Sequence, residues 1–260
     1  MLTAEYAVVN AGLDAVALKP KECDVRRALD IPLDVVAIDY EGRDHLPDQS
    51  VLARLAAERD VRLTTPVRAD GFDPLGDDSR YEWLPDGVGQ VLVAGHGAYL
   101  TESEQKRAIA PRLREAREAA PEAWVGTEGI ERIALAAGGT QYELLSRRTT
   151  RDVRALRAAG FDGEIALYAP TVLSDDDDEI LDGVGAYVSR RRPVARALPD
   201  ECEVDSGARG RAREILLKAA RDYALIGSVS DVRQRVDSLR EVGVDIVVGY
   251  PARGIDEFTE

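Results

Sequence analysis

The feature that most constrains the fold is an alternation of short apolar runs with helix-length amphipathic stretches between Ala123 and Pro170. The apolar runs cover residues 123–126, 141–145 and 164–170, and an Ala-rich segment and a basic segment lie between them. Short apolar runs that alternate with helical patterns are typical of parallel βα units. We therefore predict three consecutive βα units in this part of the chain.

The same alternation extends over the rest of the chain. The other predicted strands are residues 14–19, 34–40, 61–67, 90–95 and 245–250. The other predicted helices are 3–11, 24–29, 48–58, 78–84, 102–119, 175–190, 211–226 and 230–242. Eight strands, nearly all followed by a helix, predict a single (β/α)8 TIM barrel domain over 1–260. This pattern fits a doubly wound open sheet less well, and an irregular excursion at about 193–210 separates strands seven and eight.

The charge balance argues against a nucleic-acid partner. The chain has 34 Lys and Arg against 48 Asp and Glu, a net charge of -14, whereas phosphate backbones are bound by clustered cations. Lysine occurs only at 19, 21, 106 and 218, and an acidic, lysine-poor composition resembles that of proteins from salt-loving organisms. High salt screens such self-repulsion. We interpret the acidity as a halophilic adaptation, with no bearing on the substrate.

The chain also lacks the signals of membrane insertion, secretion and metal binding. No apolar run approaches about 18 residues, and the N-terminus is not a basic segment followed by an apolar one. Cys23 and Cys202 are the only cysteines, and neither has metal-ligand spacing around it. Asp175–Asp178 suit the start of a helix better than a cation site. We expect a cytoplasmic protein without a membrane or metal partner.

Three blocks of the second half carry a family resemblance. They are Trp124-Val125-Gly126-Thr127-Glu128-Gly129 with the helix to Ala137, Ala166 to Asp176, and Tyr223-Ala224-Leu225-Ile226-Gly227-Ser228 through to Asp245. A weaker block runs from Ser50 to Thr65. In order and spacing these blocks resemble the luciferase-like superfamily of flavin- and deazaflavin-dependent oxidoreductases, which includes bacterial luciferase and methylene-tetrahydromethanopterin reductase.

The resemblance implies an oxidoreductase or monooxygenase with FMN or the deazaflavin coenzyme F420, acting on a small-molecule substrate. The salt-adapted composition favours the deazaflavin, which many archaea carry. In the family, strand three commonly ends in small residues at a cis-peptide bulge that supports the flavin ring. Here Thr65 is the cofactor-binding candidate at that point, and Pro66-Val67 follows it. The N-terminal third is shorter than in most members, and a homodimer remains open.

The turn from Gly126 to Gly129 is the candidate phosphate site. Glycines let the backbone bend sharply, and unpaired N–H groups at the next helix start favour an anion. The resemblance places the cofactor phosphate on Gly126, Thr127, Glu128 and Gly129, with Arg132 on the following helical turn. A carboxylate beside phosphate must turn away, so we expect Glu128 to be a helix-start residue. The alternative is an ordinary βα turn that binds nothing.

Two histidines are the candidate catalytic acids or bases, because the pKa of imidazole lies near neutrality. His45 follows the second strand in an Asp-His pair like that of the family, where the histidine lies near the isoalloxazine ring. His96, between two glycines at the end of strand four, is expected at the C-terminal face of the barrel, where barrel chemistry takes place. A surface-loop role for His45 and a packing role for His96 are the alternatives.

Two other functions remain open. A barrel that lost its cofactor and became a binding or regulatory protein would fit the short N-terminal third and Pro66. A barrel lyase or aldolase would use Lys19 as a Schiff-base residue, although Lys19 is followed by Pro20 and Lys21 in a polar loop, where a lysine is usually solvated.

Overall fold

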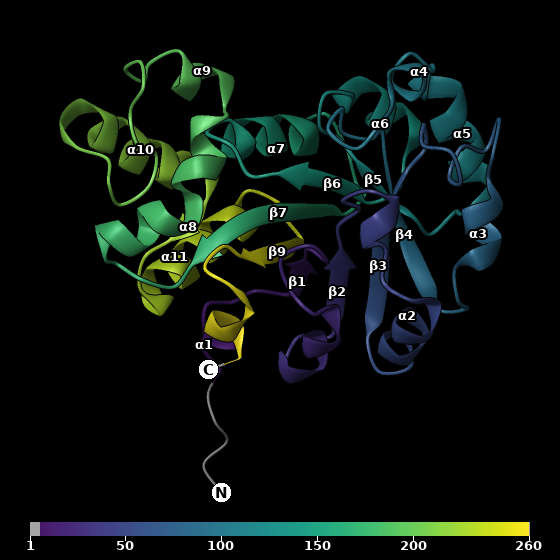
Figure 1. Cartoon of the computed structure of the whole chain (residues 1–260), viewed down its shortest axis with the longest axis horizontal. Helices are drawn as coiled ribbons and strands as arrows, with labels where there is room; N and C mark the ends of the chain where they lie inside the picture. The colour runs from purple at the N-terminus through teal and green to yellow at the C-terminus, as the bar shows by residue number, and fades with distance from the viewer. Residues whose placement is uncertain (1–5, 260) are drawn as a thin grey trace, which may run out of the picture. The chain divides into compact units, whose positions relative to one another are not determined.

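A computed structural model describes residues 6–259 (Figure 1). Its strands are β1 (Ala15–Leu18), β2 (Val35–Ile38), β3 (Asp60–Pro66), β4 (Val88–Val93), β5 (Trp124–Gly126), β6 (Gln141–Leu144), β7 (Ile165–Val172), β8 (Leu225–Ile226) and β9 (Ile246–Pro251). Its α-helices are α1 (Ala7–Asn10), α2 (Gln49–Ala56), α3 (Ser79–Trp83), α4 (Glu102–Gln105), α5 (Ile109–Ala119), α6 (Glu131–Ala137), α7 (Thr149–Ala158), α8 (Asp177–Ser189), α9 (Arg192–Ala195), α10 (Gly210–Tyr223) and α11 (Val229–Glu241). Short 3-10 helices cover Val25–Asp30, Arg43–His45 and Ile255–Phe258.

The strands form one hydrogen-bonded ladder in the order β6-β5-β4-β3-β2-β1-β9-β7-β8, and β6 also pairs with β7. This last pairing closes the ladder, so that eight strands form the barrel and β8 lies beside β7 outside the ring. The predicted (β/α)8 fold is therefore confirmed. Strand eight of the prediction is β9, and the excursion falls between β7 and β9 as expected.

The chain divides into two compact units. One comprises Ala15–Glu143 with Asp162–Ala166, and the other contains the remaining described residues. In the first unit β1 to β6 run parallel in sequence order, and β3 and β4 have the longest register, from Val61 opposite Val88 to Pro66 opposite Val93. Strand β3 ends at Pro66. This end is expected, because proline has no N–H to donate to a neighbouring strand.

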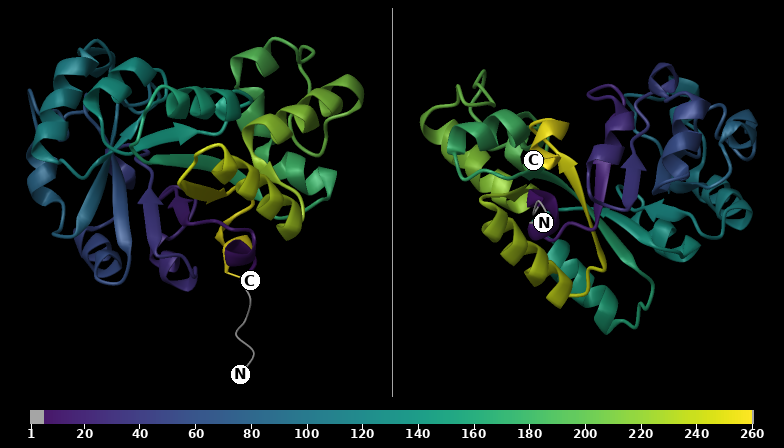
Figure 2. Two further views of the ribbon diagram at one scale, coloured as in Figure 1. Left: turned by 180° about the vertical axis from the view of Figure 1, so that it is seen from behind. Right: turned by 90° about the horizontal axis from the view of Figure 1, so that it is seen from below.

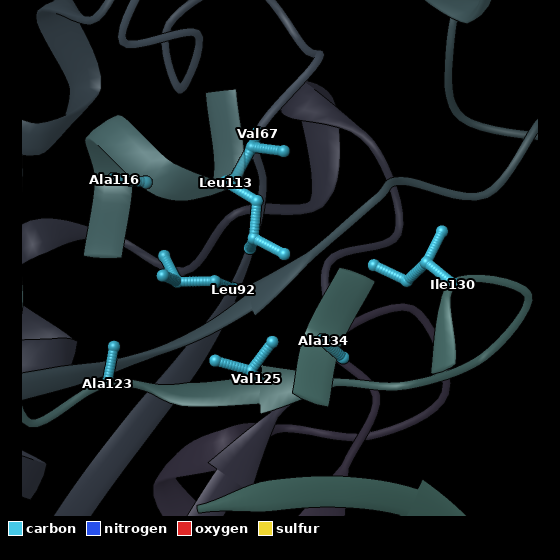
Figure 3. Close-up of a cluster of buried hydrophobic side chains, with 8 residues drawn as sticks. All are labelled: Val67, Leu92, Leu113, Ala116, Ala123, Val125, Ile130 and Ala134. Carbon is cyan, nitrogen blue, oxygen red and sulfur yellow. The ribbon is translucent and has the colours of Figure 1, made fainter. Parts of the chain in front are cut away.

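An apolar cluster fixes α5 and α6 against β4 and β5 in the first unit (Figure 3). It consists of Val67, Leu92, Leu113, Ala116, Ala123, Val125, Ile130 and Ala134, each at most 7% exposed. Ile130 belongs to the turn that follows β5, so burial of its side chain anchors one end of that turn. Burying such a side chain contributes about 1.5–3 kcal/mol.

In the second unit α8 and α10 pack against each other, and they lie side by side in both Figure 1 and Figure 2. Leu181 and Val188 of α8 meet Leu216 and Tyr223 of α10 in one buried cluster. The segment predicted as irregular at 193–210 contributes to this cluster through Val194, and it begins within helix α9. Pro193 lies in the first turn of α9, where a missing N–H costs nothing.

Other element boundaries differ from the sequence predictions for physical reasons. The helix expected over 102–119 is two helices, because the ring of Pro111 would clash with the carbonyl of Arg107 in a continuous helix. Strand β4 begins two residues earlier than predicted, at Val88, which pairs with β3. The helix expected to reach Ile226 ends at Tyr223, and Leu225 and Ile226 pair with β7 instead. Residues 3–5 of the first predicted helix lie outside the described residues.

Candidate functional site

The turn after β5 is held at both ends and open in the middle. Thr127, only 5% exposed, donates its backbone N–H to the carbonyl of Tyr142, at 3.0 Å. A methyl group on Gly126 would lie 2.8 Å from Cγ1 of Val93, so a side chain at this position meets the neighbouring strand. Gly129 has φ of +74°, and a Cβ placed there would have no atom within 4 Å. The turn therefore presents bare backbone to open space at Gly129.

Helix α6 begins directly after this turn with free backbone donors. Within residues 6–259, the N–H groups of Glu131 and Arg132 have no acceptor, whereas those of Ile130 and Ile133 bond to carbonyls of the turn. The Glu131 carboxylate accepts from the Gly129 N–H at 3.3 Å. Arg132 is exposed on the first helical turn. Open backbone, two free N–H groups and the positive end of the helix dipole thus meet at this turn, where the Glu131 carboxylate occupies the Gly129 N–H.

The sequence suggested that Glu128 starts the helix after this turn, but the structure shows that it does not. It is exposed within the turn, and α6 begins three residues later at Glu131. The left-handed φ of Gly129 explains the difference, because it separates Glu128 from the helical backbone that follows.

Aromatic side chains gather after the ends of β2, β3 and β4. The ring of Tyr40 lies edge-on to Phe72, with centroids 5.9 Å apart, and edge-on to Tyr99 at 6.5 Å. His96 lies 6.0 Å from Tyr99. Phe72 is 1% exposed, whereas Tyr99 is 38% exposed, so the cluster has a buried end and an open end. Burial raises the pKa of the Tyr40 hydroxyl above its ordinary value.

The exposed imidazole of His96 is oriented by its own loop. Its Nδ1 accepts the backbone N–H of Ala98 at 3.1 Å. A neutral imidazole that accepts at Nδ1 carries its hydrogen at Nε2, so His96 can donate a hydrogen bond through Nε2. The glycines on either side let the loop turn so tightly, and Gly95 has φ of +89°.

The other two candidate residues, His45 and Thr65, lie in different environments, one exposed and one buried. His45 is exposed in the 3-10 helix Arg43–His45, and within the described chain no hydrogen bond or ion pair holds its side chain. Thr65 is fully buried, and its Oγ1 donates to the carbonyl of Val91 at 3.5 Å. The hydroxyl of Tyr81 also interacts with Thr65, and burial raises the pKa of Tyr81. Within residues 6–259, no hydrogen bond or ion pair joins His45 or Thr65 to the turn at Gly126–Gly129.

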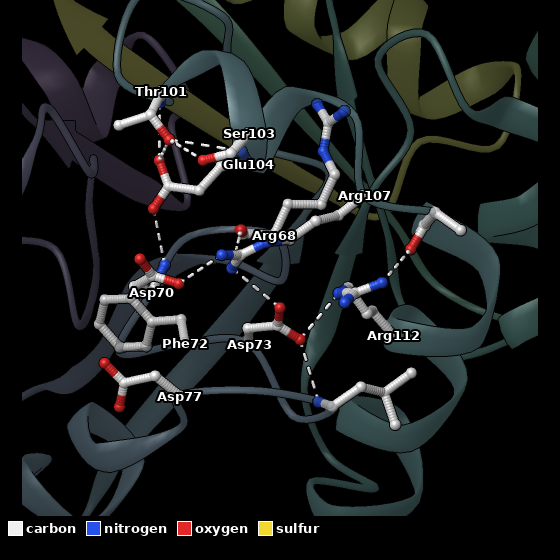
Figure 4. Close-up of polar contacts among 12 residues, drawn as sticks. Arg68, Asp70, Phe72, Asp73, Asp77, Thr101, Ser103, Glu104, Arg107 and Arg112 are labelled. Atoms are coloured by element: carbon white, nitrogen blue, oxygen red, sulfur yellow. Dashed lines mark hydrogen bonds and ion pairs between the residues drawn. The ribbon is translucent and has the colours of Figure 1, made fainter.

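A buried carboxylate, Glu104, joins three loops near the aromatic cluster (Figure 4). Its Oε1 accepts from the Asp70 N–H at 2.8 Å and from Arg43 at 3.3 Å. Its Oε2 accepts from the Thr101 N–H at 2.7 Å and from the Thr101 hydroxyl at 2.8 Å. Burial alone would raise the pKa of Glu104, but these hydrogen bonds outweigh it and hold the pKa below its ordinary value.

A second buried carboxylate, Asp73, holds the long loop between β3 and β4 (Figure 4). Only 1% exposed, it pairs with Arg107 at 2.9 Å and with Arg112 at 2.7 Å. Arg107 also pairs with Asp70, at 2.6 Å. This loop carries Phe72, so the ion pairs fix the buried end of the aromatic cluster.

Sequence reasoning missed both carboxylates as organisers of the site. A signal existed for Glu104, because Thr101-x-x-Glu104 is a capping box, which the structure forms in full. No local pattern marks Asp73, whose partners lie 34 and 39 residues further along the chain.

Comparisons with known proteins place the chain by family and fold. The family described as "Family of unknown function (DUF7388)" matches residues 8–258. No curated protein matches the sequence. Among the described residues, no helix is both long enough and apolar enough to cross a bilayer.

Three solved structures match almost the whole chain. One is the coenzyme F420 dependent tetrahydromethanopterin reductase from Methanopyrus kandleri, with a TM-score of 0.65, 13% identity, and coverage of 94% of this chain and 95% of that one. Another is an F420-dependent secondary alcohol dehydrogenase in complex with an F420-acetone adduct, with a TM-score of 0.60, 11% identity, and coverage of 94% and 95%. The third is the monooxygenase RslO1 from Streptomyces bottropensis, with a TM-score of 0.52, 17% identity, and coverage of 94% of each chain. These three structures share the (β/α)8 fold of this chain, which is the fold that the resemblance to luciferase-like enzymes predicted.

Proposed function

We propose that this chain, which belongs to the family of unknown function designated DUF7388, is an oxidoreductase that uses F420 or FMN on a small organic substrate. The observation that carries the proposal is the turn at Gly126–Gly129, where open backbone meets the free N–H groups of Glu131 and Arg132. The luciferase-like fold supports it, and two solved structures with that fold are named as F420-dependent enzymes.

The residues of the turn fit the phosphate of such a cofactor. A phosphate over Gly129 would accept the free N–H groups at the start of α6, and Arg132 could add a charge-assisted hydrogen bond. Glu131 would have to release the Gly129 N–H, since two anions repel each other. When bound, the cofactor supplies hydride transfer, and the protein supplies position and electrostatics.

His96 is an acid or base of this proposal. The Ala98 N–H occupies its Nδ1, so Nε2 is the nitrogen available to a substrate. His45 would be a second acid or base that the described chain leaves free to rotate. We prefer F420 over FMN as the cofactor. The acidic, lysine-poor composition suggests a salt-adapted organism, and many archaea carry the deazaflavin. A cytoplasmic location and a small-molecule partner, with neither nucleic acid nor membrane, belong to the same proposal.

The test compares Gly129→Val with Gly138→Val. Both glycines have positive φ, +74° and +72°, and both have open space where a side chain would go. They flank α6 at opposite ends, so both variants place a valine at positive φ while only Gly129 lies at the predicted anion site. Titration calorimetry with F420 and with FMN should show at least a tenfold loss of affinity for Gly129→Val and little change for Gly138→Val. Equal affinities in the two variants would mean that the turn is only a connection.

A cofactor-free binding protein is the second candidate, favoured by Phe72. This ring is buried between Tyr40 and Tyr81, and it fills space beyond the end of β2. Under this alternative neither F420 nor FMN binds the wild-type chain, which the same titration would show.

A further inference from the structure

A cavity of about 240 Å³ lies in the second compact unit, where four arginines gather. It is lined by Ser146, Arg147, Arg148, Arg192, Pro193, Arg196 and Tyr223. The lining comes from the start of α7, from α9 and from the end of α10. None of these residues belongs to the turn at Gly126–Gly129 or to the aromatic cluster.

The four arginines have no acidic partner. Within the part of the chain that the structure describes, the side chains of Arg147, Arg148, Arg192 and Arg196 form neither an ion pair nor a hydrogen bond, and all four are exposed. This is unexpected in a chain with 48 acids and 34 basic residues, where exposed cations easily find carboxylates. Like charges around one cavity repel each other, and an anion between them would remove that repulsion.

A tyrosine also lines this cavity. Most of the Tyr223 side chain is buried, and among residues 6–259 its hydroxyl makes no hydrogen bond. The hydroxyl itself is accessible, so it can donate to an anion in the cavity. Helix α7 begins at Thr149, next to Arg147 and Arg148, and the positive end of its dipole favours negative charge in the same place.

We propose that this cavity binds the phosphate group of a small phosphorylated ligand. Guanidinium groups match phosphate oxygens in pairs of hydrogen bonds, and four of them suit an oxyanion with two negative charges. A cavity of about 240 Å³ has room for one phosphate with a small attached group. The inference does not rest on the proposed cofactor, since it concerns other residues.

The test is titration calorimetry with pyrophosphate at constant ionic strength. The wild-type chain is compared with Arg192→Gln/Arg196→Gln and with the charge-matched control Arg154→Gln/Arg211→Gln. The control arginines are exposed on α7 and α10 and lie outside the cavity lining. Loss of about tenfold per lining arginine predicts roughly a hundredfold weaker binding for the first variant, and at most a threefold change for the control.

Two further variants, titrated with pyrophosphate in the same way, test the role of the Tyr223 hydroxyl and separate this site from the turn at Gly126–Gly129. Tyr223→Phe should weaken pyrophosphate binding severalfold, because it removes only the hydroxyl. Gly129→Val should keep the pyrophosphate binding that Arg192→Gln/Arg196→Gln loses, whether or not the turn binds an anion, so failure of the cofactor proposal and failure of this one are distinguishable. The inference is overturned if the wild type does not bind pyrophosphate, or if the lining variant and the control lose affinity equally. Unchanged thermal melting of the lining variant shows that it is folded, as expected for exposed side chains.

Discussion

Replacing Glu104 by glutamine should destabilise the protein by about 3 kcal/mol. The wild-type carboxylate accepts four hydrogen bonds, among them the N–H groups of Asp70 and Thr101 on its two separate oxygens. A glutamine has one oxygen and one NH2 group, so in either orientation its NH2 faces a backbone donor. The change removes at least one charge-assisted bond, worth about 1.5–3 kcal/mol, and leaves a buried donor unsatisfied at a further cost of about 1–3 kcal/mol.

The control is Glu102→Gln in the same helix. Glu102 is exposed, and its side chain has no partner among the described residues, so its replacement should change stability by less than about 0.5 kcal/mol. Urea unfolding measures both variants. A single transition is also expected, because the whole chain is predicted to be one domain. Glu104→Gln within 0.5 kcal/mol of the wild type would refute the reasoning.

The effect of Glu104→Gln should also depend on pH. Because the native pKa of Glu104 is lowered, its contribution is fully present above the ordinary glutamate pKa of about 4.3 and is lost as the pH falls through the lowered native value. The stability difference between wild type and variant should therefore be constant from pH 7 to about pH 5 and shrink below pH 4. A difference that grows with acid would contradict the assigned sign.

Two further substitutions test the packing around the site. Asp73→Asn leaves Arg112 without its 2.7 Å partner and should cost about 3–5 kcal/mol in urea unfolding, and a cost below 1 kcal/mol would show that the pair is dispensable. Gly126→Ala places a methyl group 2.8 Å from Val93 and should cost about 1–3 kcal/mol in thermal denaturation, whereas an unchanged melting temperature would mean that β5 has room to move.

The barrel was predictable because its strands are short, apolar and covered on both faces. The run Val35–Ile38, for example, is buried at all but its first position. The break in the helix before Ile109 was also readable, since Pro111 lies in the first turn of the second helix. Strand β8, at Leu225–Ile226, could not be predicted, because its only support is a two-residue pairing with β7.

The candidate site was predictable only where its chemistry is local. The glycines of the β5 turn and the loop around His96 can be read from sequence, because each depends on neighbouring residues. The carboxylates Glu104 and Asp73 depend on arginines from other segments of the chain, and the arginine cavity depends on residues from α7, α9 and α10 coming together. Such pairings are set by the fold, so they become visible only once the fold is known.

The most direct measurement of the proposed function is thermal denaturation of the wild-type chain with F420 and, separately, with FMN. A cofactor that binds only the folded chain stabilises it by about 2.7 kcal/mol at one hundred times its dissociation constant, and the effect grows with the logarithm of concentration. We predict a concentration-dependent rise in melting temperature with F420 and a smaller one with FMN. No rise with either cofactor at millimolar concentration would contradict the proposal that this barrel is a cofactor-dependent oxidoreductase.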